Sequence, residues 1–409
     1  MYDITQKIYK KLMNYSLPQQ IFISMMIASL FSLLLPDVAS YMAILGTIFI
    51  SALKSIAPIL VFTIVLSSIA NQQKDINTSH IKNIIILYLI GTFAAALIAV
   101  IFNMIFQVHV DLPYNSSNID IAAPSSITTM FTNLLLQAFD NPISALYNAN
   151  YIGILVWSIA LGIAFLHAKQ STKQILEDLS NGITYIVKLI ISFAPIGIFG
   201  IVCNVLSTTG FSAFLQYFEL LFVLVLSITL TALVLNPIII YFYIKKNPYP
   251  LILKCLQISG ISAFFMRSSA GNIPVNMQLC EDLHLNKNIY SMSIPIGANI
   301  NMAGAAITIT TFALTAAYSM NIEVTFFNAL LTCIVASVSA CGASGVAGGS
   351  LLLIPFACSL FNISNEVAME FVSIGFIIGI IQDSMETALN SSTDVIFTAA
   401  VSEGENLEI

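Results

Sequence analysis

The stretch from residue 382 to residue 395 reads Gln-Asp-Ser-Met-Glu-Thr-Ala-Leu-Asn-Ser-Ser-Thr-Asp-Val and lies within a long apolar segment. Asp383, Thr387, Asn390 and Asp394 follow one another at intervals of four, three and four residues. Because an α-helix turns by about 100° per residue, these side chains lie within an arc of roughly 40° on one helix face, with Glu386 at its edge. The stretch therefore predicts a helix with one strongly polar face.

The composition predicts that this helix lies in a membrane. Of 409 residues, 58% are hydrophobic and 8% are charged, and the mean hydropathy is +0.91. Soluble domains contain about 25% charged residues, because a folded surface must present polar groups to water. The chain is therefore predicted to be an integral membrane protein, which excludes soluble enzymes, nucleic-acid-binding proteins and disordered proteins. Three carboxylates in one apolar span are costly in lipid and are expected to line a polar site.

Apolar runs of spanning length cover the first part of the chain, and the fourth is interrupted near residues 140–142. These runs are 19–36, 41–70, 82–106, 127–168, 183–209 and 213–244. Basic residues occur in alternate loops, whereas residues 107–150 contain aspartates but no Lys or Arg. By the positive-inside rule, this pattern predicts a cytoplasmic N-terminus. Lys54 breaks the pattern, and it either snorkels toward an interface or faces protein.

Polar clusters interrupt the apolar sequence from residue 250 onward. They are Arg267-Ser-Ser-Ala-Gly-Asn-Ile-Pro274, Gly297-Ala-Asn-Ile-Asn-Met-Ala-Gly304, Ser339-Ala-Cys-Gly-Ala-Ser-Gly-Val-Ala-Gly-Gly-Ser350 and Asn390-Ser-Ser-Thr-Asp394. Non-helical backbone is tolerated in a membrane only where it is buried in protein or lines a cavity. The first and third clusters therefore read as tips of re-entrant hairpins, and the second as the unwound centre of a helix.

Two glycine-interrupted units in corresponding positions indicate an inverted-repeat transporter with a site near the membrane midplane. Helix packing through small residues is the alternative, but it does not explain the adjacent Asn, Asp and Arg side chains. Asp383, Glu386, Asp394 and the single arginine, Arg267, carry a formal charge of −2. Such a pocket attracts a metal ion, a substrate ammonium or protons. The alternative interpretation of these charged residues is a buried ion-pair network that holds helices together.

At these residues the chain resembles the dicarboxylate/amino acid:cation symporters, which have the glutamate-transporter fold. RSSAGNIPVN resembles the family's first hairpin tip, INMAGAA its NMDGT-type helix break, and GASGVAGG its second hairpin tip. The polar face from Asp383 to Asp394 resembles that of the last helix. RSSAGNIPVN, NMAGAAITIT and QDSMETALNSSTDV are most similar to the bacterial sodium:serine/threonine symporter branch.

The resemblance implies an all-α membrane protein of eight transmembrane helices and two re-entrant hairpins, built as inverted repeats and assembled as a homotrimer. Residues 1–182 would form mainly scaffold and trimerisation spans, with the third span joining the transport domain, and residues 183–244 would add further scaffold spans. The transport core, 250–401, would contain hairpin 251–280, broken helix 287–318, hairpin 328–360 and helix 366–400. Residues 402–409 would form a cytoplasmic tail, and the protein would lie in the bacterial inner membrane with both termini cytoplasmic.

The resemblance also implies site residues. Asp383 would bind the substrate ammonium, Asn390 its carboxylate, and Thr387 would support them, with Arg267 and Glu386 beside the pocket. Backbone groups from the hairpin tips would come from Ser268, Ser269 and Val346. One sodium ion would bind Asp394 and the carbonyls of Gly297, Asn301 and Asn390. A second would bind Asn299 and the carbonyls of Ala340, Cys341 and Ala343. No organic cofactor is expected.

Departures from the family pattern shift the predicted substrate. Glu386 stands where members that carry acidic amino acids have an arginine, so a second substrate carboxylate would be repelled. Ala303 and Ala305 replace the Asp and Thr of the NMDGT motif, so fewer coupled sodium ions are expected. Arg267 turned toward the pocket would restore a positive charge there, but it is expected instead to pair with Glu386 or with Asp383.

These features predict sodium-coupled symport of small neutral amino acids, serine or threonine, by an elevator-type alternating-access mechanism. A dicarboxylate or acidic amino acid carrier of the same fold, coupled to sodium or protons, is the main alternative. A channel and a proton-coupled transporter remain rival classes. A membrane enzyme is disfavoured because the Ser and Thr residues have no intramembrane His beside them.

Overall fold

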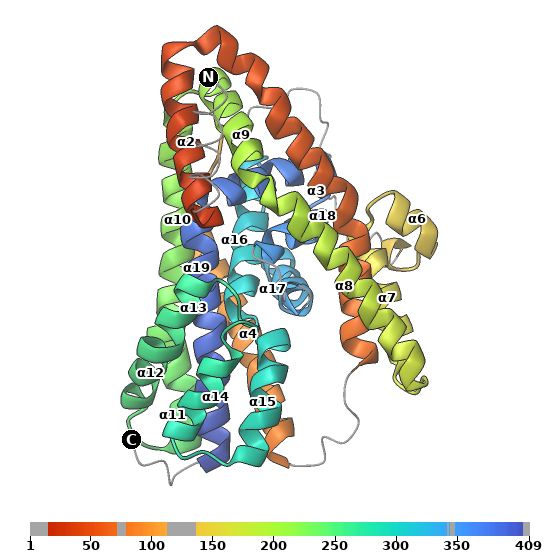
Figure 1. Cartoon of the computed structure of the whole chain (residues 1–409), viewed down its shortest axis with the longest axis vertical. Coiled ribbons are helices and arrows are strands. Elements are labelled where there is room, and N and C mark those ends of the chain that lie inside the picture. The colour runs from red at the N-terminus through yellow and green to blue at the C-terminus, as the bar shows by residue number, and fades with distance from the viewer. Residues whose placement is uncertain (1–14, 72–78, 113–135, 342, 344–347, 404–409) are drawn as a thin grey trace, which may run out of the picture.

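The computed structural model describes residues 15–71, 79–112, 136–341, 343 and 348–403, and every regular element in these ranges is a helix (Figure 1). Seven helical spans there are long and apolar enough to cross a membrane, and a bent helix pair makes an eighth. One of the seven, residues 249–266, is an arm of the first hairpin. The predicted fold class, an all-helical membrane protein, is confirmed.

One group of helices is built around a long helix, α3. The group comprises α2 (Leu17–Leu34), α3 (Pro36–Ala70), α6 (Pro142–Tyr147), α7 (Tyr151–Phe165), α8 (Gln170–Ser192) and α9 (Ala194–Thr208). Helix α3 packs against α7, α8 and α9, and α2 packs against α9. Glycines allow the close contact of α3 with α9, since a Cβ atom at Gly200 would lie 2.3 Å from the backbone nitrogen of Gly46. Small residues serve the same purpose in other membrane helix pairs.

The second group contains the remaining helices and surrounds α16 and α19. Its members are α4 (Ser79–Phe106), α10 (Ser212–Leu230), η2 (Thr231–Leu235), α11 (Asn236–Ile244), α12 (Tyr249–Cys255), η3 (Leu256–Gly260), α13 (Ile261–Met266), α14 (Ile273–Asp282), α15 (Lys287–Ile300), α16 (Ala303–Ser319), α17 (Phe326–Ala340), η4 (Gly349–Leu353), α18 (Ile354–Ser359) and α19 (Asn365–Glu403). Helix α4 packs against α16 and α17, and α10 packs against α4, α16 and α19. The span 212–244, which the sequence groups with the scaffold, thus packs on the elements around α19.

The interrupted segments have the predicted form. The first hairpin is α12–η3–α13 followed by α14, and α15 and α16 are separated by a break at residues 301–302. The second hairpin rises through α17 and returns through η4 and α18. Residues 342 and 344–347 of its tip lie outside the described part of the chain, as does the predicted ligand Val346. In Figure 1 the hairpins lie beside α19, which runs through the centre of the second group.

The span predicted at residues 183–209 differs from the prediction in its start and in its straightness. Helix α8 begins at Gln170, 13 residues before the predicted start at residue 183, because its first turns are amphipathic and polar. It is bent by 53° from α9 at Phe193, where Pro195 cannot continue the hydrogen-bond ladder. In the fourth predicted run, the interruption near residues 140–142 is confirmed, because Asn141 caps α6 through the backbone N–H groups of Ile143 and Ser144.

Lys54 faces protein. Its Nζ lies 2.5 Å from Oε1 of Glu366, the second residue of α19. The pair joins α3 of the first group to α19 of the second. Phe49, one turn and a half earlier on α3, makes an edge contact with Phe376 of α19 at 5.4 Å between ring centroids. These two contacts place the first turns of α19 beside the middle of α3.

Candidate functional site

Asp383 on α19 connects the two hairpins. Its Oδ2 accepts a hydrogen bond from Nε of Arg267 at 2.7 Å, and its Oδ1 accepts one from the backbone N–H of Gly348 at 3.2 Å. Arg267 ends α13 with a left-handed backbone (φ 51°), and this turn directs the chain into the first hairpin tip. Both side chains are largely buried, at 14% and 5% exposure. The arginine that the sequence leaves between two partners therefore pairs with Asp383.

Glu386, one turn further along α19, is held by a separate set of donors. Its Oε2 accepts hydrogen bonds from Oγ1 of Thr308, Oγ of Ser350 and Nε2 of Gln382, at 2.8, 2.8 and 2.5 Å. The donors come from α16, the return arm of the second hairpin and α19 itself. Sequence reasoning missed all three donors, although Ser350 closes the third polar cluster and Gln382 is a polar residue beside Asp383 in an apolar helix.

Asn301 fastens the helix break to α19. Its Nδ2 donates to the Asn390 carbonyl, Oγ1 of Thr393 and Oδ1 of Asp394, at 3.2, 2.8 and 2.9 Å. In return, Oδ1 of Asn390 accepts from the backbone N–H of Gly304 at 2.7 Å. That N–H is one of the donors that the start of α16 leaves without a partner inside the helix. The predicted residues Asn301, Asn390 and Asp394 are therefore brought together.

Buried oxygen atoms without partners remain in this cluster. Within the described chain, Oδ2 of Asp394 and Oδ1 of Asn301 are buried and accept no hydrogen bond. Gly297 lies against the same carboxylate, since a Cβ atom there would lie 2.5 Å from Oδ1 of Asp394. A buried carboxylate oxygen is costly unless a donor or a cation satisfies it. Carboxylate and carbonyl oxygens are the ligands of hard cations, so the residues present suit a sodium ion.

The residues predicted for the second sodium site lie around the break between α15 and α16. The side chain of Asn299 is exposed, and its Nδ2 donates to the Pro295 carbonyl at 2.9 Å. The thiol of Cys341 approaches the Ile300 carbonyl at 3.6 Å, which places the end of α17 beside the helix break. Ala340 and Ala343 are buried in the same region.

The remaining predicted substrate ligands bond locally. Oγ of Ser268 accepts from the backbone N–H of Gly271 at 3.0 Å, and the Ser269 carbonyl accepts from that of Asn272 at 3.2 Å. These bonds shape the first hairpin tip. Oγ1 of Thr387 donates to the Asp383 carbonyl at 2.7 Å, so its hydroxyl is used within α19.

A buried polar cluster fixes the first hairpin to α19, and sequence reasoning did not identify it. Nδ2 of Asn272 donates to Oγ of Ser391 at 2.8 Å, and Nδ2 of Asn276 donates to the Ser391 carbonyl at 3.0 Å. Ser259 of η3 donates to Oδ1 of Asn276 at 2.5 Å. The sequence signal was the i, i+4 pair of Asn272, the N-cap residue of α14, and Asn276 inside that helix, facing the Ser-Ser dipeptide of α19.

One small cavity lies beside the site, and one larger cavity lies away from it. A cavity of about 20 Å³ adjoins Arg267, Gly348 and Gln382, and is closed on the other side by residues of α2, α8 and α9. This volume holds about one water molecule, so this cavity is too small for an amino acid.

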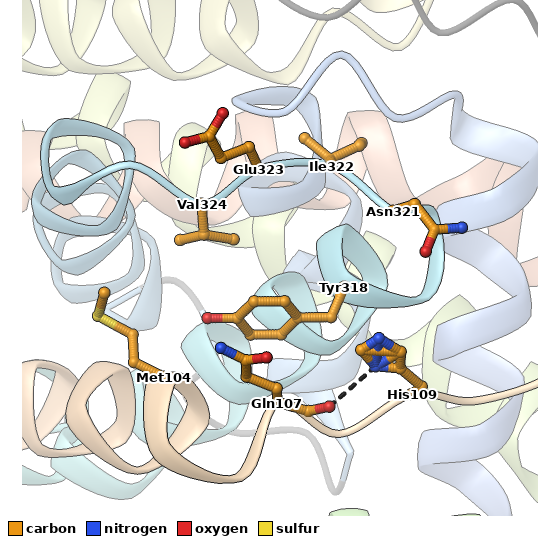
Figure 2. Close-up of a pocket in the computed structure, with 8 residues that line it drawn as sticks. All are labelled: Met104, Gln107, His109, Tyr318, Asn321, Ile322, Glu323 and Val324. Carbon is orange, nitrogen blue, oxygen red and sulfur yellow. Dashed lines mark hydrogen bonds between the residues drawn. The ribbon is translucent and has the colours of Figure 1, made fainter.

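A larger cavity of about 370 Å³ lies at the far end of α16 (Figure 2). Figure 2 shows Tyr318 between Val324 on one side and Gln107 and His109 on the other, with the His109 and Tyr318 rings stacked at 6.1 Å. No residue of α19 lines this cavity, so it is separate from the cluster around Asp383.

Hairpins, a broken helix and a polar last helix meeting in one buried site define a membrane transporter that binds small solutes and cations together. The model of the sodium:dicarboxylate symporter family matches residues 17–403. The chain belongs to this family. It is a multi-pass membrane protein with symporter activity, a small-molecule substrate and sodium as the co-transported ion.

Proposed function

We propose that this protein couples sodium entry to the uptake of small neutral amino acids, with serine and threonine as preferred substrates. The observation that carries this proposal is the arrangement around Glu386. Three donors hold its carboxylate at the position where acidic-substrate members have an arginine, and the chain's single arginine is engaged by Asp383. A second substrate carboxylate would meet the buried like charge of Glu386, and no arginine stands at that position to bind it.

Asp383 would bind the substrate ammonium by exchange with Arg267. Both groups are cations that a carboxylate binds through charge-assisted hydrogen bonds, so only one of them can occupy Oδ2 at a time. Nη2 of Arg267 already lies 3.4 Å from the Gly379 carbonyl, which offers the displaced guanidinium a partner. The substrate carboxylate would be received by Asn390, whose Nδ2 donates, within the described part of the chain, only to the thioether of Met302, a weak acceptor.

Sodium binding at Asp394 would prepare the substrate site. An ion held by Asp394, Asn301 and the Asn390 carbonyl would fix the residue that receives the substrate carboxylate. Such an arrangement makes the affinities for sodium and amino acid mutually dependent, as symport requires.

Asp394→Asn is expected to raise the sodium concentration for half-maximal uptake by about tenfold or more, because a charged oxygen ligand is replaced by a neutral one. The measurement is the sodium dependence of labelled-serine uptake into proteoliposomes. Thr398→Val is the matched control, since it removes a hydroxyl one turn further along α19 and should keep the wild-type sodium dependence. An unchanged sodium dependence in Asp394→Asn would exclude this residue as a ligand.

Transport would use a fixed scaffold and a moving carrier. We place α2, α3 and α6–α9 in the scaffold, and α4 and α10–α19 in the carrier, on the basis of their packing. With a cytoplasmic N-terminus, α3 and α19 both start at the outer face. Lys54 lies 18 residues into α3, about 27 Å from its outer end, yet contacts the start of α19. We therefore interpret the structure as the inward-displaced state of a homotrimer subunit in the bacterial inner membrane.

Reversing the Lys54–Glu366 pair should alter the rate of transport. Lys54→Glu is expected to change the initial uptake rate a few-fold, a small effect because the pair is 36% and 61% exposed and such pairs contribute little. The double variant Lys54→Glu with Glu366→Lys should return toward the wild-type rate. A double variant no better than the single one would exclude a role for this contact in the transport cycle.

The decisive test is uptake of labelled serine into proteoliposomes, with and without an inward sodium gradient. Uptake should require sodium, and unlabelled serine, threonine and alanine should compete. Equal uptake in potassium or choline would exclude sodium coupling. Stronger competition by aspartate or succinate would favour a dicarboxylate carrier of the same fold, and uptake driven by a pH gradient in sodium-free buffer would favour proton coupling.

A further inference from the structure

The two oxygen atoms of Glu386 have different environments. All three donors, Thr308, Ser350 and Gln382, bond to Oε2. Oε1 accepts no hydrogen bond from any residue in the described part of the chain. A carboxylate oxygen can only accept, and it has room for more than one donor. Among the residues that the structure describes, the buried Glu386 side chain therefore has one oxygen that accepts three hydrogen bonds and one that accepts none.

We propose that Oε1 of Glu386 accepts the hydrogen bond of the substrate's side-chain hydroxyl, an inference that rests on the proposed function. Asp383 and Glu386 are three residues apart on α19, so they are neighbours on the helix surface. In serine and threonine, the hydroxyl is borne by the carbon next to the one that bears the ammonium. An amino acid with its ammonium on Asp383 therefore directs its hydroxyl toward the adjacent carboxylate.

The donors on Oε2 give the carboxylate a fixed orientation. They come from α16, α19 and the return arm of the second hairpin, so the glutamate rotamer is constrained from three directions. Ser350 follows Gly348 by two residues, and the Gly348 N–H contacts Asp383. The ammonium and hydroxyl subsites are therefore both complete only when this arm is in place. Preorganised acceptors of this kind discriminate well, since a substrate without the matching donor leaves them unpaired.

The arrangement predicts a preference for hydroxyl amino acids over their deoxy analogues. Alanine is serine without its hydroxyl, and 2-aminobutyrate is threonine without its hydroxyl. A hydrogen bond to a charged group contributes enough that each hydroxyl amino acid should bind about tenfold more tightly than its analogue. Both pairs share the ammonium and carboxylate contacts, so the ratio within a pair isolates the hydroxyl subsite.

The experiment measures competition of labelled-serine uptake into proteoliposomes at saturating sodium, for serine, alanine, threonine and 2-aminobutyrate. In the wild-type protein, both ratios should be about ten. Glu386→Gln should lower both ratios to a few-fold, since a charge-assisted bond becomes a neutral one. Asp394→Asn is the matched control, because it is also a carboxylate-to-amide change in α19 and should weaken all four amino acids without altering the ratios.

Each outcome has one meaning. Wild-type ratios near one overturn the inference whether or not Glu386→Gln folds, and size-exclusion chromatography reports on that folding. Wild-type ratios near ten that persist in a folded Glu386→Gln variant also overturn it. In both cases sodium-driven uptake of neutral amino acids would leave the proposed function intact. Absence of sodium-driven uptake of labelled serine overturns the proposed function and this inference together.

Discussion

Asp383→Asn is expected to lower serine affinity by about 100-fold or more, because the variant removes the carboxylate proposed to bind the substrate ammonium. A charge pair desolvated in a buried site typically contributes 2–5 kcal/mol to binding when one partner is truncated, and about 1.4 kcal/mol corresponds to a factor of ten. The side chain is 5% exposed, so water cannot replace the lost partner effectively. Serine binding to purified protein, measured by isothermal titration in sodium buffer, checks this.

Arg267→Gln distinguishes this role from a structural one. If the Asp383–Arg267 pair only held the hairpins together, removing either partner would leave an uncompensated buried charge and have a similar effect. If Asp383 binds the ammonium, removing Arg267 removes a competitor, and Arg267→Gln should retain far more serine affinity than Asp383→Asn. Thermal unfolding of both variants shows whether each is folded. Comparable losses of affinity in two folded variants would contradict the proposed role.

Glu386→Arg is expected to shift competition toward aspartate and glutamate by at least about tenfold while weakening serine. A guanidinium at this position offers a bidentate partner to a side-chain carboxylate. The surroundings can accommodate it in part, because Oε1 of Gln382 is buried, has no hydrogen-bond partner among the described residues, and can accept from the new donor. The measurement is the inhibition of labelled-serine uptake, or of labelled-aspartate uptake if serine uptake is lost.

Glu386→Lys and Glu386→Gln are the controls for this change. Lysine supplies positive charge without the planar fork, so its gain for aspartate should be smaller than that of arginine. Glutamine removes the negative charge alone, and any gain for aspartate there measures the relief of repulsion. If aspartate competes equally in wild type and in all three variants, residue 386 does not set the charge preference of the substrate.

The helical fold and the polar face of α19 were predictable because their signals are local. The intervals between Asp383, Thr387, Asn390 and Asp394 match the helical repeat, so one continuous helix had to place them together. The hairpins and the break at Asn301 were predictable for a related reason, since small polar clusters inside apolar sequence have few places in a membrane protein. The amphipathic start of α8 was not predicted, because an apolar run locates only the part of a helix that lies in the membrane and does not locate polar turns that precede it.

The pairing of these residues across the fold was decided only by the tertiary structure. The sequence left two acidic partners possible for Arg267, Asp383 and Glu386. The first hairpin is held against α19 by hydrogen bonds of Asn272 and Asn276 to Ser391, and this position brings Arg267 to Asp383. Of the three donors to Glu386, Ser350 is 36 residues away in the sequence and Thr308 is 78 residues away. Only Gln382 lies on the same helix.

The sequence by itself therefore determined which residues would be buried and polar, because burying charge in an apolar span restricts where such residues can lie. Which donor bonds to which oxygen depends on distances of about 3 Å between separate helices, and these follow from how three elements pack. The asymmetry of the Glu386 carboxylate, in which one oxygen accepts three hydrogen bonds and the other accepts none from the described residues, was therefore decided only by the tertiary structure.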